Sequence, residues 1–320
     1  MKRLAVGLIA LTLVAAGCGA DSSGSPGSSS GSARPDDVTV GLISIVDVAP
    51  IYLGKEKGFF AERNIDLTLK PAEAGTETIP AVLSGDLRFG YSNVVTLLLA
   101  AEQGLPVKVL VNGNNSTGVQ GADFGSLMVP ANSPIRSVAD LKGKKVAVNV
   151  LQNVVELAVR ASASKAGIDP ESIEYVKLAF PDMPAALTAG QVDAAFVVEP
   201  FQQIVASQGG RPVASSLVDL APNLSVAQYF TSKQTVADNP DLTQRFTDAM
   251  KESLAYAESH PDEVGKILPT YTKIPQEIIP KLVLPKWVPQ VNRDSVEAIV
   301  RLARKENILQ SEPDIDDLLP

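Results

Sequence analysis

The side chains of this chain that are able to do chemistry are mostly short polar groups and carboxylates, because it has a single cysteine and a single histidine. Cys18 follows an apolar run near the N-terminus, and His260 lies in a Ser-His-Pro sequence typical of a helix end. The sequence contains no phosphate-binding loop, GxGxxG turn, HExxH motif, GxSxG elbow or calcium loop. It therefore predicts no cofactor and no metal site, and it favours binding over catalysis.

Three carboxylates follow predicted strands or open predicted helices: Asp47, Asp182 and Glu199. Glu199 comes directly after the apolar run 194–198, where a buried carboxylate without a partner is costly. It either pairs inside the protein or accepts a hydrogen bond from a ligand, and we favour the ligand. No lysine or arginine occurs in the strand-end segments, although helix N-termini can also hold an anion. These features favour an amine-bearing or heterocyclic nitrogen compound over a bare anion.

In open α/β sheets, ligands bind outside the carboxyl ends of the strands, so the polar residues at those ends are the candidate contacts. The predicted ligand-binding residues are Ser44, Asp47, Tyr52, Gly75, Thr76, Ser92, Asn93, Asn112, Asn149, Gln152, Asn153, Asp182, Glu199 and Phe201. Helix capping is the alternative for Thr76, Ser92, Asn93, Asn153 and Asp182. A turn is the alternative for Asn112, and the favoured interpretation for Asn114 and Asn115.

Short β-branched runs alternate with helix-like segments from residue 38 onward. Strands are expected at 38–44, 65–70, 88–91, 107–111 and 145–149, and helices at 50–61, 76–84, 93–103, 240–260 and 295–307. Residues 274–289 are expected to form a connector containing a short helix. Such alternation predicts an α/β fold with parallel sheets and helices on their faces.

An internal repeat suggests two similar halves. Residues 80–91 (PAVLSGDLRFGY) align with 184–196 (PAALTAGQVDAAF), and each segment has the pattern helix, glycine stop, strand. The neighbouring elements occur in the same order in both halves. The sequence thus predicts two βαβ lobes with a cleft between them.

The N-terminal segment resembles a lipoprotein signal peptide. Lys2 and Arg3 precede the apolar run 4–14, which is shorter than the ~20 residues that a membrane span needs, and small residues precede Cys18. We expect residues 1–17 to be removed and Cys18 to carry lipid, which anchors the protein on the extracytoplasmic side of a cell membrane. Residues 18–37, rich in serine and glycine, are expected to be a flexible linker.

The net charge of −8 excludes a general role in binding nucleic acid, which requires a basic surface. We expect no nucleic-acid partner, a membrane link through the lipid alone, and a monomer.

Seven segments together resemble the solute-binding proteins of ABC importers in the nitrate/sulfonate/taurine group, which includes relatives that bind thiamin pyrimidine precursors. They are 40–43 (VGLI), 49–52 (APIY), 57–60 (KGFF), 83–86 (LSGD), 180–184 (FPDMP), 192–195 (VDAA) and 199–201 (EPF). The resemblance implies a type II periplasmic-binding-protein fold, a hinge, closure over a small molecule, and delivery to an ABC permease and its ATPase.

The resemblance also implies that the chain crosses between the lobes twice, near 121–129 and 223–232. Lobe 1 is then expected at 38–122 plus 226–320, and lobe 2 at 123–225. Two other functions stay open: an enzyme on the same fold, such as a pyrimidine-precursor synthase or a lyase acting on chorismate derivatives, and a ligand sensor that needs no transporter.

Overall fold

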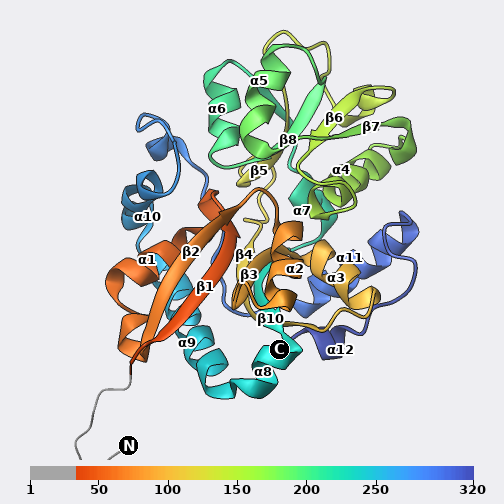
Figure 1. Cartoon of the computed structure of the whole chain (residues 1–320). Helices are drawn as coiled ribbons and strands as arrows, with labels where there is room; N and C mark the ends of the chain where they lie inside the picture. Colours follow the sequence, from red (N-terminus) through yellow and green to blue (C-terminus); the bar gives the residue numbers. More distant parts are fainter. Residues whose placement is uncertain (1–33) are drawn as a thin grey trace, which may run out of the picture. The chain divides into compact units, whose positions relative to one another are not determined.

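Two five-stranded sheets organise residues 34–320, which are the part of the chain that the computed structural model describes (Figure 1). The predicted signal peptide, Cys18 and residues 18–33 of the predicted linker lie outside the described residues. The first strand begins at Asp36, two residues earlier than predicted, so the last two positions assigned to the linker belong to the fold. No helix within 34–320 combines the length and the apolar character needed to cross a membrane.

The strands divide between the sheets according to where the chain crosses. In spatial order, sheet A contains β2 (Ile65–Ala72), β1 (Asp36–Ile43), β3 (Phe89–Asn93), β10 (Ser225–Ser232) and β4 (Val107–Asn115). Sheet B contains β7 (Glu174–Lys177), β6 (Lys145–Val148), β8 (Ala194–Val198), β5 (Gly125–Val129) and β9 (Arg211–Ala214). We use lobe 1 and lobe 2 for sheet A and sheet B with the helices that cover them; the lobe boundaries given above stay a prediction.

The predicted parallel strands are present in both sheets, but each sheet is mixed, because one of its strands runs against the others. Strand β10 runs antiparallel to β3 and β4, and β5 runs antiparallel to β8 and β9. These are the two strands with which the chain enters a sheet after crossing from the other one. A strand that enters a sheet at the carboxyl ends of the parallel strands has to run antiparallel to them. The repeat within the sequence does not include these two entering strands, so it does not predict their direction.

Helices cover both faces of each sheet (Figure 1). Lobe 1 has α1 (Ala49–Lys57), α2 (Gly75–Ser84), α3 (Val94–Glu102), α8 (Lys233–Asp238), α9 (Pro240–Ser259), α10 (Pro261–Ile267), α11 (Arg293–Lys305) and α12 (Ile315–Leu318). Lobe 2 has α4 (Val154–Lys165), α5 (Met183–Thr188), α6 (Phe201–Ser207) and α7 (Ser216–Leu220). Short 3-10 helices lie at Val46–Val48 (η1), Ala61–Arg63 (η2), Val138–Leu141 (η3), Pro170–Ser172 (η4), Phe180–Asp182 (η5), Leu268–Thr270 (η6) and Ile279–Lys281 (η7).

Local sequence signals explain where several helices begin and end. Helix α2 ends at Gly85, whose φ of 87° is a left-handed conformation that glycine adopts without strain. The Asn93 side chain accepts a hydrogen bond from the Thr96 amide and so caps α3. Helix α9 buries one apolar face, with Phe246 stacked on Phe89 of sheet A at 3.8 Å between ring centroids.

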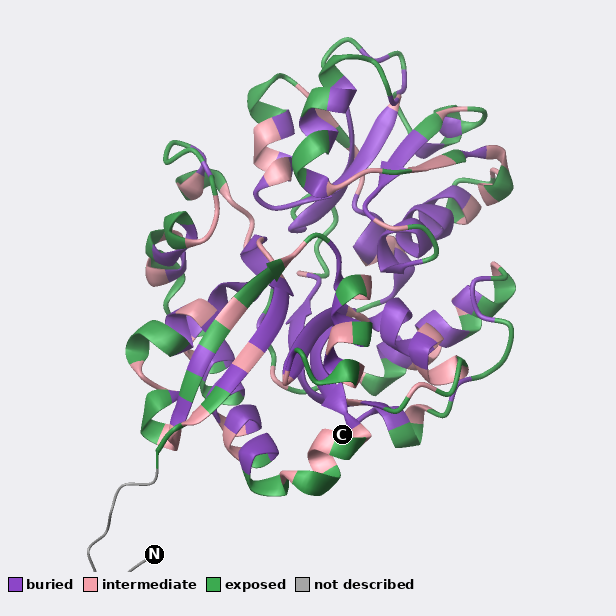
Figure 2. Cartoon of the chain, in the orientation of Figure 1, coloured by how far each residue is buried: buried purple, intermediate pink, exposed green. Residues whose placement is uncertain are grey.

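The burial pattern separates central strands from edge strands (Figure 2). All five residues of β5 and of β8 are buried, whereas β2, at the edge of sheet A, alternates buried and exposed positions. Strand β4 continues to Asn115, so the favoured turn at Asn114 and Asn115 was wrong, as was the turn alternative for Asn112. These three asparagines are buried in the strand, which pairs with β10 on one side, while the amides of Asn112 and Asn115 donate to the carbonyl oxygens of Pro289 and Lys286 on the other.

Candidate functional site

The structure brings together two of the three predicted carboxylates. Asp47 lies in η1 after β1, and Glu199 lies after β8 in the other sheet. Both residues are buried, with 3% and 0% exposure. The Val46 amide donates a hydrogen bond to the Glu199 carbonyl oxygen at 3.3 Å, which joins the two segments across the lobes.

The two carboxylates differ in how the protein satisfies them. The Glu199 carboxylate accepts hydrogen bonds from the Val283 amide at 3.1 Å, from the Gln203 amide and from the side chains of Gln202 and Gln203. Of the two alternatives for Glu199, the structure therefore shows pairing inside the protein. Asp47 accepts one hydrogen bond, from the Asn114 side chain to Oδ2 at 2.9 Å, and its buried Oδ1 has no partner within residues 34–320.

Burial raises the pKa of both carboxylates. It raises the pKa of Asp47 to about 7 and the pKa of Glu199 to about 7, because neither carboxylate is well solvated. The charges of Asp123 and Glu199 add to the rise at Asp47. No ion pair among the described residues includes Asp47, Glu199 or Asp123. The site thus concentrates carboxylates without a basic partner from the described protein.

Three tyrosines lie near Asp47, and a fourth stacks on one of them. Half-buried Tyr52 and Tyr271 stack at 3.7 Å between centroids, with an angle of 6° between the rings. The Tyr91 hydroxyl donates to Asn114 Oδ1 at 2.7 Å, whereas the buried Tyr229 hydroxyl has no partner within residues 34–320. Burial and the charge of Asp47 raise the pKa of Tyr91, Tyr229 and Tyr271. We call Tyr52, Tyr91, Tyr229 and Tyr271 the tyrosine cage.

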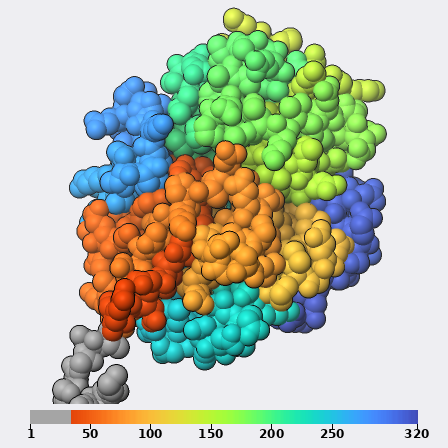
Figure 3. Space-filling model, viewed as in Figure 1, coloured from red at the N-terminus to blue at the C-terminus, as the bar shows by residue number. Residues whose placement is uncertain are grey.

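The indole of Trp287 also contacts this site, since its Nε1 donates to the Asp47 carbonyl oxygen at 3.0 Å. Trp287 is buried and is the single tryptophan of the chain. It follows Val283 on the segment that runs past both carboxylates. Figure 3 shows this C-terminal part of lobe 1, in blue, against the teal and green surface of lobe 2.

Capping explains two of the predicted contacts, and one of these also links the lobes. Asn153 caps α4 by accepting from the amides of Val155 and Glu156, and its Nδ2 donates to Asn149 Oδ1 at 2.8 Å. Asn93 caps α3 and also accepts from the Val154 amide of lobe 2 at 3.4 Å. The Asn93 side chain therefore joins the start of α3 to the start of α4, which Asn153 caps.

Gly75 and Ser92 lie in close contact: a Cβ atom added to Gly75 would lie only 2.7 Å from Ser92 Oγ. That oxygen is buried and has no partner within residues 34–320, so capping does not account for Ser92. Thr76 lies inside α2 rather than at its cap, which is Ala74. Asp182 occupies the cap position of α5 without a capping hydrogen bond and is exposed.

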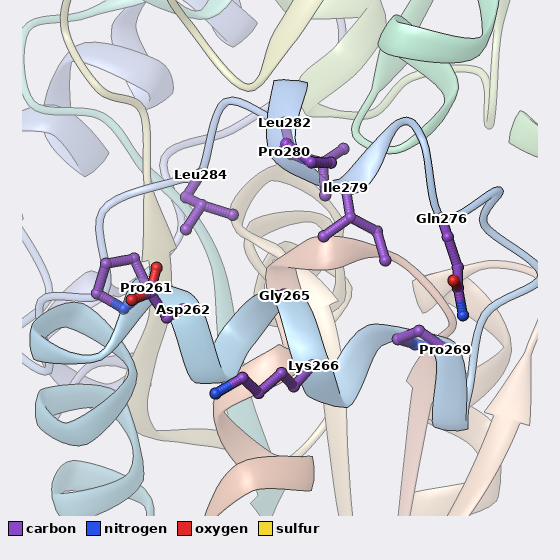
Figure 4. Close-up of a pocket in the computed structure, with 10 residues that line it drawn as sticks. All are labelled: Pro261, Asp262, Gly265, Lys266, Pro269, Gln276, Ile279, Pro280, Leu282 and Leu284. Carbon is purple, nitrogen blue, oxygen red and sulfur yellow. The ribbon is translucent and has the colours of Figure 1, made fainter.

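A cavity of 280 Å³ lies between the lobes beside these helix starts. Thr76 of α2 and Thr96 of α3 line it from lobe 1, and Leu151 and Gln152 line it from lobe 2. A larger cavity of 780 Å³ lies within lobe 1 between α10 and residues 276–284, where Figure 4 shows apolar side chains facing α10. None of the predicted contacts lines that second cavity.

The remaining predicted contacts are less informative. Ser44 is half-buried after β1, and half-buried Phe201 stacks on Phe180 at 6.3 Å between centroids. The sequence reasoning missed Asp123, Tyr229, Tyr271 and Trp287. No three metal-ligating side chains cluster within residues 34–320.

The fold is that of the type II periplasmic binding proteins. The ligand-binding component of an ABC-type import system from Staphylococcus aureus, solved with zinc bound, superposes with a TM-score of 0.77 at 14% identity, covering 89% of this chain and 96% of that one. The desulfurization enzyme DSZB has the same fold, with a TM-score of 0.62 at 18% identity over 88% of this chain and 95% of its own. The fold alone therefore admits both binding proteins and enzymes.

Sequence comparison identifies the family. Residues 45–264 match the family model described as NMT1/THI5 like, and the chain belongs to this family. The taurine-binding periplasmic protein of Escherichia coli is 25% identical over 260 residues, which are 78% of each chain. The riboflavin-binding protein RibY of Chloroflexus aurantiacus is 23% identical over 277 residues, 82% of this chain and 76% of its own.

Proposed function

We propose that this protein is the extracytoplasmic solute-binding component of an ABC importer, and that it captures an amine-bearing or heterocyclic nitrogen compound between its lobes. The observation that carries the proposal is the buried Asp47 carboxylate, which has one unpartnered oxygen and no ion-pair partner within residues 34–320. The taurine- and riboflavin-binding relatives and the S. aureus import component support a binding role.

The chemistry of the site fits a cationic nitrogen. An ammonium group placed at Asp47 Oδ1 gains a charge-assisted hydrogen bond and restores the ionised form of the acid. The faces of Tyr52 and Tyr271 stabilise the same charge by cation–π attraction, worth ~0.5–2 kcal/mol for a partly desolvated pair. A bare anion would instead meet Asp47 and Glu199 and be repelled.

Closure follows from contacts to both lobes. Asp47 belongs to lobe 1 and Glu199 to lobe 2, and the Val46 and Val283 amides already donate to Glu199 across the lobes. A ligand at Asp47 that also touches lobe 2 binds the closed form more tightly and shifts the population toward it. The closed pair of surfaces is what the permease and its ATPase would recognise, with the lipid on Cys18 holding the protein at the membrane.

Trp287 makes the test direct, because a ligand at Asp47 disturbs the single tryptophan. We would titrate the full-length protein in detergent with n-butylamine, cytosine, taurine, riboflavin and ethanesulfonate, following Trp287 emission and calorimetry. We expect nitrogen compounds to bind, and Asp47→Asn to weaken an amine by ~1.5–3 kcal/mol. Asp66→Asn is the matched control, since Asp66 is exposed on β2, is not among the predicted contacts and should leave the affinity unchanged.

Two results would contradict the proposal. Tight binding of ethanesulfonate with no response to the nitrogen compounds would reverse the ligand preference. Conversion of a bound compound into a new product would favour the enzyme alternative, which the DSZB fold match supports; recovery of the compound unchanged by mass spectrometry supports binding.

A further inference from the structure

The Asp47 site is closed in this structure, so a ligand reaches it only after part of the protein has moved. Asp47 is 3% exposed, and neither of the two cavities described above is lined by Asp47 or Glu199. Two parts of the chain cover the site. One is lobe 2, through the hydrogen bond from the Val46 amide to the Glu199 carbonyl oxygen. The other is the segment leading to Trp287, whose indole donates to the Asp47 carbonyl oxygen.

Residues 279–285 form the middle of this second cover, and we call them the strap. Lobe 1 holds the chain on either side of the strap: Ile278 is buried in its apolar cluster, and Lys286 forms an antiparallel bridge with β4. Apart from bonds to residues 276 and 278, one hydrogen bond joins the strap to the rest of the described chain. It runs from the Val283 amide to Glu199 Oε1 at 3.1 Å. The strap is thus fixed at its ends to lobe 1 and at Val283 to lobe 2.

The 780 Å³ cavity lies between the strap and α10 (Figure 4). Ile279, Leu282 and Leu284 line it from the strap and are half-buried, so part of their apolar surface remains in water. On the other side, Gly265 of α10 has no side chain, and a Cβ there would have only Ile279 Cγ2 within 4 Å, at 3.0 Å. Movement of the strap toward α10 has space to occur and would bury more apolar surface.

We propose that the strap is a gate over the Asp47 site, with one position docked on Glu199 and a second docked on α10. In the first position, which is the one in this structure, Val283 pairs with Glu199 and Trp287 stays against Asp47. In the second, the leucines of the strap fill the cavity, the hydrogen bond to Glu199 breaks, and the site opens beside Trp287 while the lobes stay together. The gate serves the site of the proposed function, but it moves without ligand and is tested without ligand.

The indole proton of Trp287 reports on the gate, because the chain has one tryptophan and its Nε1–H is buried against Asp47. NMR of the full-length protein in detergent measures how fast this proton and the backbone amides exchange with deuterium. Gly265→Leu puts a side chain into the cavity and should block the second position. We expect the indole proton and the Val283 amide to exchange about fivefold more slowly. The β1–β2 amides and the Val154 amide, which reports separation of the lobes at Asn93, should keep their rates.

A second variant acts in the opposite direction. Val283→Pro removes the amide that pairs with Glu199, and the ψ of 137° at Leu282 already suits a residue before proline. Loss of this hydrogen bond should make the indole proton exchange about five- to tenfold faster. Ala255→Leu is the matched control for Gly265→Leu, since it adds a leucine at an exposed position of α9. It should leave the rate of the indole proton within about twofold.

Three results would overturn the gate and leave the proposed function intact. The first is an unchanged indole rate in Gly265→Leu. The second is slowing of the indole proton together with the β1–β2 amides, which shows that the leucine only stabilises the whole fold. The third is a Val154 amide that changes in step with the indole proton in Gly265→Leu, because the site then opens by lobe separation alone. Failure of every nitrogen compound to bind, with the exchange rates as expected, contradicts the proposed function and leaves the gate in place.

Discussion

At the scale of single residues, Asp47 and Glu199 tie the stability of the protein to pH. Burial raises the pKa of each to about 7, from ordinary values of 3.8 and 4.5. Between pH ~4 and ~7 the folded state therefore binds more protons at these groups than the unfolded state. Their contribution to stability is complete below pH ~4 and is lost as the pH rises through 7.

We predict that Asp47→Asn removes part of this pH dependence. Relative to the unmodified protein, the variant should gain unfolding free energy as the pH rises from 4.5 to 7.5, by up to ~1.4 kcal/mol per pH unit. Denaturant unfolding at pH 4.5, 6.0 and 7.5 measures the difference. Carboxylates outside the site act equally in both proteins, so a constant difference would mean that Asp47 keeps an ordinary pKa.

The predictability of the site also varies from residue to residue. Asp47 and Glu199 were predictable because each follows an apolar strand, and parallel strand ends share an edge. Asp182 satisfied the same rule yet is exposed, since sequence position does not say which way a helix start points. Tyr229 and Tyr271 were missed because they reach the site from the returning strand and the C-terminal segment, through contacts far apart in sequence.

At the scale of elements, the crossing of α1 and α9 depends on one glycine. Gly54 is buried in α1, and a Cβ there would lie 1.8 Å from Ser253 Oγ and 2.8 Å from Ser253 Cβ. The absence of a side chain lets the two helices approach closely, as small residues do at packed interfaces. Helix α1 begins directly after η1, so its position also sets that of Asp47.

We predict that Gly54→Ala destabilises the protein by about 1–3 kcal/mol, although alanine normally favours a helix by ~1 kcal/mol over glycine. Chemical denaturation provides the measurement. The double variant Gly54→Ala with Ser253→Gly removes the side chain that the new methyl group would meet. It should recover at least about 1 kcal/mol of the lost unfolding free energy. Strictly additive effects would show that the two residues do not compete for the same space.

Elements were predictable where one local signal decides them. The glycine stop of α2 and the asparagine cap of α3 lie where the sequence indicates. Strand β4 extends through an asparagine-rich segment whose residues favour turns. Its pairing with β10 and an antiparallel bridge between Asn115 and Lys286 outweigh this local preference for a turn. Tertiary pairing of this kind leaves no trace in a single strand's own residues.

At the scale of the whole described chain, three groups of polar contacts join the lobes in addition to those made by the crossing segments. The Val46 and Val283 amides donate to Glu199, the Val154 amide donates to Asn93, and Arg160 of α4 lies 3.6 Å from Glu306 beyond α11. Two similar lobes were predictable from the repeat, and the double crossing from the family resemblance. These contacts were not predictable, because they join segments that share no sequence pattern. One buried apolar cluster also contains side chains of both lobes, including Val94 of α3 and Val155 of α4.

The amides in these contacts allow closure to be measured directly. We predict that, without ligand, the backbone amides of Val46, Val154 and Val283 exchange with deuterium faster than those in the β1–β2 ladder, because each loses its partner when the lobes separate. A nitrogen compound found by Trp287 titration should slow all three together, since it raises the population of the closed form. The β1–β2 amides lie within one lobe and should not respond. If the compound binds and the three amides keep their rates, the ligand does not act through closure, and recognition by a permease would have to depend on lobe 1 or lobe 2 alone.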